Sequence, residues 1–255
     1  MQIVGYETER EARLPAVLLA EDGAVTRRTL SAGDDLTYTL SDRRCAGVVT
    51  EDGHRSCSRP GTPYCDQHTS TWICARCTGT CLKPEMDCYE EHAVYLAAFA
   101  PDVFKVGVTR SWRLETRLRE QGADRAAHIH TVSNGRIARE LEADYATDLV
   151  DRVRVPTKIA GLAETVDELA WEAVLDEFDP IETFTFDYDL SLATRPVAET
   201  LFSGTVVGVK GRVLVLERGG TTYAVDMRNL VGYEVTETAP QRSLQSSLGA
   251  FSCGR

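Results

Sequence analysis

The sequence has no hydrophobic run that could cross a membrane. Its longest uninterrupted apolar stretch covers residues 93–100, whereas a transmembrane helix needs about 20 residues. The first residues also lack the pattern of a secretory signal peptide, because Glu7, Glu9 and Glu11 stand where a basic start and an apolar segment would be needed. We therefore expect a cytoplasmic protein that makes no contact with membranes.

Lysine is scarce in this chain. Of the 28 basic residues only Lys83, Lys105, Lys158 and Lys210 are lysines, against 39 acidic residues, and the net charge is −11. Such an acidic chain is not expected to coat nucleic acid through bulk charge. Excess acid with little lysine is halophilic-like and indicates a salt-adapted cytosol; the alternative is a GC-rich genome that favours arginine codons.

Several catalytic motifs are missing as well. The sequence contains no Gly-rich phosphate loop, no Ser/His/Asp order and no HExxH string. The nearest approach to a phosphate loop, residues 207–211, lies inside a strand pattern with no helix after it. His128 and His130 alternate along an expected strand, which predicts both imidazoles on one face, but the sequence identifies no third ligand for a metal there.

Cysteine, by contrast, is concentrated in one segment. Residues 45–92 hold seven of the eight cysteines and three of the five histidines. Disulfides are disfavoured in a cytosolic chain, and two-residue spacers, as in Cys65-Asp-Gln-His68 and Cys74-Ala-Arg-Cys77, let one metal ion bind two side chains. We expect two structural zinc ions, each with four protein ligands and no open position for a water nucleophile.

The simplest partition of these ligands follows the chain order. The first ion takes Cys45, Cys57, Cys65 and His68, and the second takes Cys74, Cys77, Cys81 and Cys88. An interleaved pairing is an alternative, as are disulfides or buried free thiols. His54 and His92 are expected to lie outside both sites, and Cys253 is expected to be incidental.

The remaining pattern predicts an α+β protein in five segments. These are an N-terminal β segment (1–40), the Cys-rich segment (41–92), an α/β core (93–190), a small β module (191–238) and a flexible tail (239–255). Within the core we expect a hairpin over 93–108, a strand near 128–132 and helices over 111–121, 135–150 and 166–178. Thr165 and Glu168 fit a capping box at the start of the last helix. Ten acids and no base between Glu164 and Asp189 indicate a solvated outer face.

The core resembles a divergent GIY-YIG domain, a nuclease fold in which two short strands form a hairpin that carries the name motifs. The residues that carry this resemblance are Ala93-Val-Tyr95, Lys105-Val-Gly107-Val-Thr109, Arg117, Gln121-Gly and Ala138-Arg-Glu-Leu-Glu142. The KVGVTR and QGA strings and the late VVGVKGRVLVLE module also resemble a family of archaeal and bacterial proteins catalogued as a domain of unknown function. That second resemblance spans about residues 40–235.

The GIY-YIG resemblance implies a metal-dependent endonuclease. It makes Tyr95 the base or orienting group, Glu142 the ligand of Mg²⁺ or Mn²⁺, and Arg117 the phosphate clamp, with Arg113 and Arg110 as further candidates. Lys105 replaces the second tyrosine of the family pattern and becomes a candidate phosphate contact. The alternative that this replacement raises is a non-catalytic zinc-stabilised binding or scaffold protein with a degenerate nuclease-like core.

Residues 105–125 form a basic segment inside the acidic chain. They contain six bases and three acids, which indicates a polyanion partner; the alternative is a solvated amphipathic helix. Trp112 and Phe104 are candidates for stacking on bases, although the strand and helix patterns also suit them to a core. We therefore expect a zinc-stabilised nucleic-acid-binding protein, with phosphodiester cleavage as the activity that the resemblance adds.

Overall fold

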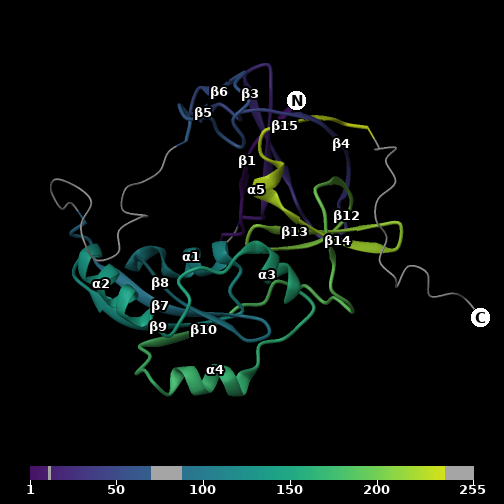
Figure 1. Cartoon of the computed structure of the whole chain (residues 1–255). Helices are drawn as coiled ribbons and strands as arrows, with labels where there is room; N and C mark the ends of the chain where they lie inside the picture. Colours follow the sequence, from purple (N-terminus) through teal and green to yellow (C-terminus); the bar gives the residue numbers. More distant parts are fainter. Residues whose placement is uncertain (11–12, 70–87, 239–255) are drawn as a thin grey trace, which may run out of the picture. The chain divides into compact units, whose positions relative to one another are not determined.

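The computed structural model of the chain describes residues 1–10, 13–69 and 88–238 (Figure 1). The chain divides into two compact units, one made of residues 1–69 and 188–255 and the other of residues 70–187. Strands predominate over helices in this mixed α+β protein. No helix in the described ranges is both long and apolar enough to span a membrane.

The first unit is built on a nine-stranded sheet to which both ends of the chain contribute. Its elements are β1 (Gln2–Glu7), β2 (Ala16–Glu21), β3 (Ala24–Thr29), β4 (Asp35–Arg43), β11 (Val197–Ala198), β12 (Phe202–Lys210), β13 (Val213–Arg218), β14 (Thr221–Asp226), β15 (Tyr233–Thr236) and the short helix α5 (Met227–Leu230). The order across the sheet is β11-β14-β13-β12-β4-β15-β1-β2-β3. Neighbouring strands are antiparallel except β11 and β14.

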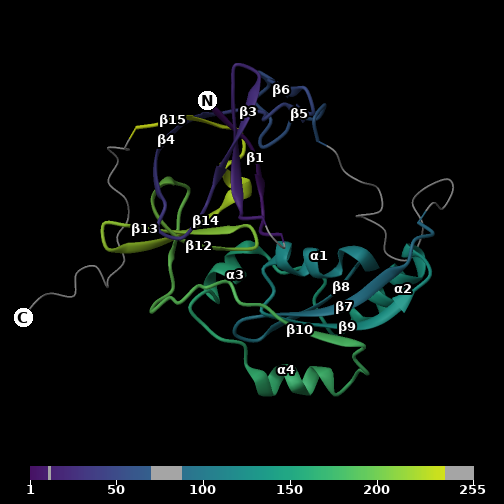
Figure 2. The same cartoon turned by 180° about the vertical axis from the view of Figure 1, so that it is seen from behind.

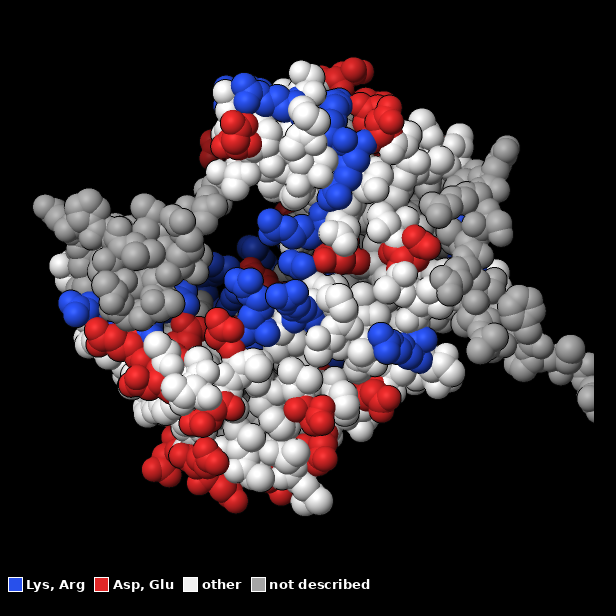
Figure 3. All heavy atoms as spheres, viewed as in Figure 1, with Lys and Arg blue, Asp and Glu red and all other residues white. Residues whose placement is uncertain are grey.

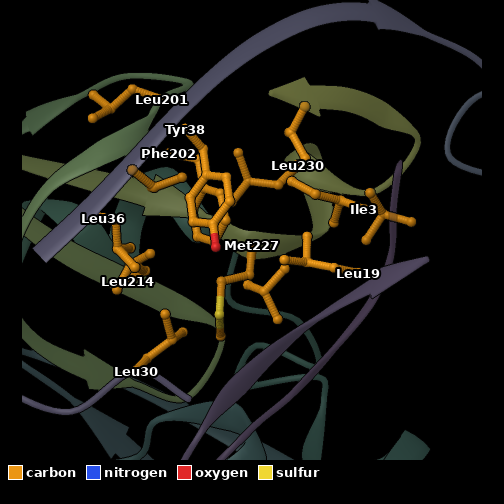
Figure 4. Packing of buried hydrophobic residues seen from close by; sticks show 14 of the residues in the cluster. Ile3, Leu19, Leu30, Leu36, Tyr38, Leu201, Phe202, Leu214, Met227 and Leu230 are labelled. Carbon is orange, nitrogen blue, oxygen red and sulfur yellow. The ribbon is translucent and has the colours of Figure 1, made fainter. Parts of the chain in front are cut away.

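The β segments expected as separate pieces at 1–40 and 191–238 therefore share one sheet. The long strand β4 joins them, because it pairs with β12 on one side and β15 on the other. Tyr38 of β4 and Phe202 of β12 are register partners whose rings stack at 4.9 Å between centroids (Figure 4). Ile3, Leu214 and Met227 pack in the same core, so residues from both ends of the chain exclude water together.

Two short hairpins of this unit are formed by neighbouring segments of the chain. Gly219 and Gly220 both have positive φ between β13 and β14, a conformation that glycine adopts without strain. The small hairpin of β5 (Val48–Thr50) and β6 (Gly53–Arg55) lies between Cys45 and Cys57. It places the cysteines before and after it close enough to meet.

The second unit is a four-stranded sheet with helices on both faces. Its elements are β7 (His92–Phe99), β8 (Val103–Arg110), the 3₁₀ helix η2 (Ser111–Arg113), α1 (Leu114–Gln121), β9 (Arg125–Val132), α2 (Gly135–Tyr145), α3 (Val155–Ala160), α4 (Glu168–Leu175) and β10 (Glu182–Thr185). The strand order is β10-β9-β7-β8. The hairpin and the three helices expected from the sequence are present, although the helices near 135–150 and 166–178 are shorter than expected.

Every residue of β7 is buried, and its side chains alternate between two covered faces. Val94, Leu96 and Ala98 pack in one cluster with Ala138 of α2 and Trp171 of α4. The intervening residues, including Tyr95, face the side covered by α1 and α3. Figures 1 and 2 show α1 and α4 on opposite sides of this sheet.

The start of α4 differs from the sequence expectation. Asp167, not Thr165, is the N-cap residue, and its Oδ1 accepts a hydrogen bond from the Ala170 backbone N–H at 3.1 Å. Thr165 lies before the helix and is exposed. A Thr and a Glu three residues apart fit the capping box, but an Asp one residue before the helix can make the same contact, and the sequence pattern does not decide between them.

Candidate metal centre and basic surface

Four of the expected zinc ligands come together in the first unit. Cys45, Cys57, Cys65 and His68 place one ligand atom each within 4.8 Å of all the others. The Sγ atoms of Cys45 and Cys65 lie 3.3 and 3.4 Å from His68 Nδ1, and the Sγ atoms of Cys57 and Cys65 lie 4.0 Å apart. Tetrahedral zinc separates sulfur from nitrogen by about 3.5 Å and two sulfurs by about 3.8 Å, so the group fits such an ion.

The local fold brings the four ligand side chains together. Cys45 follows β4 and Cys57 follows β6, while Cys65 and His68 flank a single turn. The backbone N–H groups of Gly47 and Cys65 both donate to Cys45 Sγ, at 3.4 and 3.3 Å. These two contacts fix the position of the Cys45 sulfur. Burial raises the pKa of the neighbouring Tyr64 hydroxyl, which therefore stays neutral beside the cysteines.

With four protein ligands the centre has no coordination position left for a reacting water. A Cys₃His set of this kind suits a structural zinc ion. His54 lies outside the group, and its Nε2 contacts the Ala46 carbonyl oxygen at 2.8 Å.

The second expected ligand group is described only in part. Cys74, Cys77 and Cys81 lie outside the described residues. Cys88 is a free, half-buried cysteine whose carbonyl oxygen accepts a hydrogen bond from the Gly135 N–H at 2.9 Å.

Tyr95 and Lys105, both buried, meet at the side chain of Gln121. The Gln121 Nε2 donates to the Tyr95 hydroxyl at 2.6 Å, and its Oε1 accepts from Lys105 Nζ at 3.2 Å. Lys105 Nζ also donates to the Asp151 carbonyl oxygen at 3.0 Å, and Lys158 Nζ donates to the Gln121 carbonyl oxygen at 2.5 Å. Two of the four lysines therefore contact one glutamine.

Gln121 and Lys158 were not identified as site residues from the sequence. The signals were present, since the QGA string belongs to the resemblance and Lys158 is one of four lysines. The structure explains the string: Gln121 binds Tyr95, Gly122 ends α1 with a φ of +69°, and Ala123 is fully buried.

The arginines expected at the phosphate lie on β8, η2 and α1. Arg113 and Arg117 both pair with Glu120, at 3.0 and 3.3 Å. Arg110 pairs with Glu90 at 3.1 Å and Arg119 with Glu115 at 3.0 Å. All four arginine side chains are partly exposed, between 26% and 46%.

Trp112, expected from its pattern to be a core residue or a base-stacking one, is 71% exposed. Its ring centroid lies 5.9 Å from the Arg113 guanidinium carbon, and its Nε1 is 3.4 Å from a Glu90 carboxylate oxygen. Phe104 instead packs against Trp171, with 5.7 Å between ring centroids. We call the set of Trp112, Arg110, Arg113, Arg117 and Arg119 the Trp112 surface.

Glu142 does not join these residues. It lies on α2, where its carboxylate pairs with Arg139 at 2.5 Å. The helix packs through Ala138 against the face of β7 that carries Val94, whereas Tyr95 points to the α1 side. The sheet therefore lies between Glu142 and Tyr95, and the structure brings together Tyr95, Lys105 and the segment of Arg117 without the expected metal ligand.

The expectation that His128 and His130 share a face is wrong. A β-bulge between β7 and β9 aligns His128 with Tyr95 and His130 with Val94, which lie on opposite faces. The extra residue, Ile129, breaks the period of two on which the expectation rested. His130 Nε2 instead contacts the Tyr145 hydroxyl at 2.7 Å, and His128 Nε2 lies 3.0 Å from Thr131 Oγ1.

Charge is separated on the surface of this unit. In Figure 3 basic side chains gather over α1, whereas acidic side chains gather over α4. The acidic group agrees with the solvated face expected between Glu164 and Asp189. Arg125, in contrast, pairs with Glu168 at the start of α4, at 2.6 Å, so the basic segment of the sequence is not wholly part of the basic surface.

Comparison with known proteins identifies one family. Residues 51–193 match the model of the family described as Protein of unknown function (DUF2797). Searches of curated proteins and of solved structures found no match, so the comparisons give no support to a GIY-YIG core. The family match covers more than half of the 255 residues, and this chain belongs to the DUF2797 family.

Proposed function

We propose that this protein binds single-stranded nucleic acid through the Trp112 surface. The observation that carries the proposal is Trp112 itself, a large aromatic side chain that is 71% exposed beside Arg113 and that shares Glu90 with Arg110. Arg117 and Arg119 follow on α1. Proteins that bind single strands combine a basic track for the backbone with aromatic rings on which bases stack. Bases in a duplex are already stacked, so an exposed tryptophan favours a single strand.

The ion pairs on this surface can exchange for phosphate at little cost. Exposed pairs such as Arg110 with Glu90 contribute about 0–1 kcal/mol each. A phosphate accepts several hydrogen bonds from a guanidinium, so it can replace a carboxylate there. With about four arginine contacts, log Kd should change with log salt with a slope of magnitude about 3.

We propose binding without cleavage. A GIY-YIG-type reaction needs the tyrosine and the metal-binding glutamate at one phosphate, and Glu142 lies across the sheet from Tyr95, paired with Arg139. In a protein that binds without cleaving, the buried Lys105 and Tyr95 have a structural role. Both form hydrogen bonds with Gln121 and so link the sheet to α1. The Cys₃His centre would hold a structural zinc ion in the first unit.

Fluorescence anisotropy of labelled oligonucleotides tests the binding proposal. The full chain is titrated into single-stranded RNA, single-stranded DNA and duplexes over a range of KCl concentrations. Trp112→Ala should weaken single-strand binding by about 5- to 150-fold, because stacking of one base contributes about 1–3 kcal/mol. Replacing Arg113 and Arg117 together by Glu should weaken binding further and reduce the salt slope.

Two matched controls lie elsewhere in the same unit. Leu169→Ala removes another exposed apolar side chain, and Arg136→Glu reverses an exposed helical arginine that pairs with Glu140. Both variants should bind as the wild type does. Equal affinity of wild type, Trp112→Ala and the double arginine variant would disprove the proposal, and Mn²⁺-dependent cleavage that Glu142→Ala abolishes would disprove binding without cleavage.

A further inference from the structure

An acidic side chain borders the exposed ring of Trp112. Glu90 Oε2 accepts a hydrogen bond from Trp112 Nε1 at 3.4 Å and pairs with Arg110 Nε at 3.1 Å. Neither contact uses the second carboxylate oxygen, Oε1, and the Glu90 side chain is 54% exposed. The carboxylate therefore keeps an accepting oxygen at the edge of the ring on which a base would stack.

The backbone on both sides of this contact is fixed by hydrogen bonds. His92, which is only 7% exposed at the start of β7, donates from Nδ1 to the Glu90 carbonyl oxygen at 2.7 Å. The backbone N–H of Ser111, directly after β8, donates to the Glu91 carbonyl oxygen at 3.0 Å. Glu90 and Trp112 thus flank the same end of the β7–β8 hairpin, and the carboxylate is in place before any ligand binds.

Charge alone does not explain a carboxylate on this surface. Glu90 repels phosphate, so it weakens the attraction that Arg110 and the other arginines of the Trp112 surface supply. A carboxylate attracts N–H groups instead. A base that stacks on an aromatic ring presents the donors and acceptors of its edge to the groups around that ring, so a carboxylate there can select bases by the donors that they offer.

Guanine is the base that offers such donors side by side. Its Watson–Crick edge carries N1–H next to the N2 amino group, and one carboxylate oxygen with two lone pairs can accept from both. In adenine and cytosine the amino group lies next to an acceptor nitrogen, and in uracil N3–H lies between two carbonyl oxygens. Those acceptors repel a carboxylate.

We propose that Glu90 makes the Trp112 surface selective for guanine in single-stranded nucleic acid. The inference rests on the proposed function and adds the base that the stacking site prefers. Guanine stacks on Trp112 and donates from N1–H and the N2 amino group to Glu90 Oε1, while Oε2 keeps its contacts with Trp112 and Arg110.

Fluorescence anisotropy with strands that differ at one base tests the inference on the full chain. The probes are a labelled oligouridine and the same strand with one central guanosine, inosine, adenosine or cytidine, together with the matching DNA set in thymidine. The guanosine strand should bind about 5- to 150-fold more tightly than oligouridine. The inosine strand should lie between them, because inosine keeps N1–H but lacks the amino group.

Glu90→Gln should abolish this preference. Trp112 Nε1 and Arg110 Nε are both donors, so the amide turns its oxygen toward them and its NH₂ group toward the base. The guanosine strand should therefore bind more weakly than it does to the wild type. Oligouridine should bind at least as tightly as before, because a negative charge is removed.

Glu115→Gln is the matched control. Glu115 also pairs with an arginine of the Trp112 surface, Arg119 at 3.0 Å, and its side chain is 52% exposed, so this variant should keep the guanine preference. Wild-type binding that is equal for all bases would overturn the inference and leave single-strand binding intact. An unchanged guanine preference in Glu90→Gln would also overturn it, since the carboxylate would then act only as the partner of Arg110. If no strand binds at any salt concentration, the proposed function fails and the inference fails with it.

Discussion

Gly107 is the residue on β8 that gives the ring of Tyr95 its space. The two residues are register partners, and a Cβ at Gly107 would lie 2.6 Å from both Cζ and the hydroxyl oxygen of the tyrosine. Tyr95 is only 1% exposed, so the ring cannot move aside into solvent. The glycine of the KVGVTR string is therefore required by packing on the α1 face of the sheet.

We predict that Gly107→Ala destabilises the protein by about 1–3 kcal/mol, the usual cost of overpacking a core. Urea denaturation measures this change. In a Tyr95→Leu background the same substitution should cost less, because the atoms that clash are gone. Gly5→Ala in β1 is the control: there a Cβ would meet only the Leu18 side chain, with the nearest methyl group at 3.2 Å. Equal costs of Gly107→Ala in both backgrounds would contradict the packing argument.

Among the elements, α4 is a short helix whose start depends on one side chain. Asp167 caps it through the Ala170 N–H, and its own backbone N–H donates to the Pro101 carbonyl oxygen at 2.7 Å. Only the first of these contacts uses the side chain. Trp171, on the next turn, packs in the hydrophobic cluster with Val94 and Leu96 of β7. The cap therefore fixes the position of the helix from which this ring enters the cluster.

We predict that Asp167→Ala lowers the free energy of unfolding by about 1 kcal/mol, as loss of an N-cap usually does. Thr165→Ala is the matched control, since the capping-box pattern in the sequence favours Thr165 whereas the structure favours Asp167. It should change the free energy by less than about 0.5 kcal/mol. Urea denaturation of the two variants distinguishes the two caps, and a larger effect at Thr165 would contradict the structure.

Elements were predictable from the sequence where a local pattern determines them. The apolar run of β7, the turn at Gly219-Gly220 and the spacing of Cys65 and His68 are all local. The β-bulge at Ile129 was not predictable, because it is set by how β9 pairs with β7, and it moved His128 and His130 to opposite faces. The exposure of Trp112 likewise depends on which face of η2 the rest of the unit covers.

At the scale of the whole molecule, the features that the sequence does not predict are set by pairing between segments that are distant in the chain. Nothing local indicates that β4 joins β12 and β15 in one sheet, or that α2 packs on the face of β7 away from Tyr95. Residues in the right order along the chain, such as Tyr95 and Glu142, are thus separated by a strand layer. The first metal group was predictable because its four ligands lie within 24 residues, too short a span for distant pairing to separate them.

That compact group leads to a prediction about the first unit. Its four ligands close the segment between β4 and the turn at His68, and β4 is the strand that joins both halves of the nine-stranded sheet. Zinc that binds only the folded state adds its binding free energy to folding.

Cys57→Ser should therefore lower the melting temperature of the first unit. Near-ultraviolet circular dichroism of Tyr38, whose ring stacks on Phe202 in that unit, can follow the transition. Cys253→Ser, which removes the one cysteine outside residues 45–92, is the control and should melt as the wild type does. A Cys57→Ser variant with unchanged melting and unchanged zinc content would show that the group holds no structural metal. If melting falls and one zinc ion is lost, the metal stabilises the sheet that both ends of the chain build.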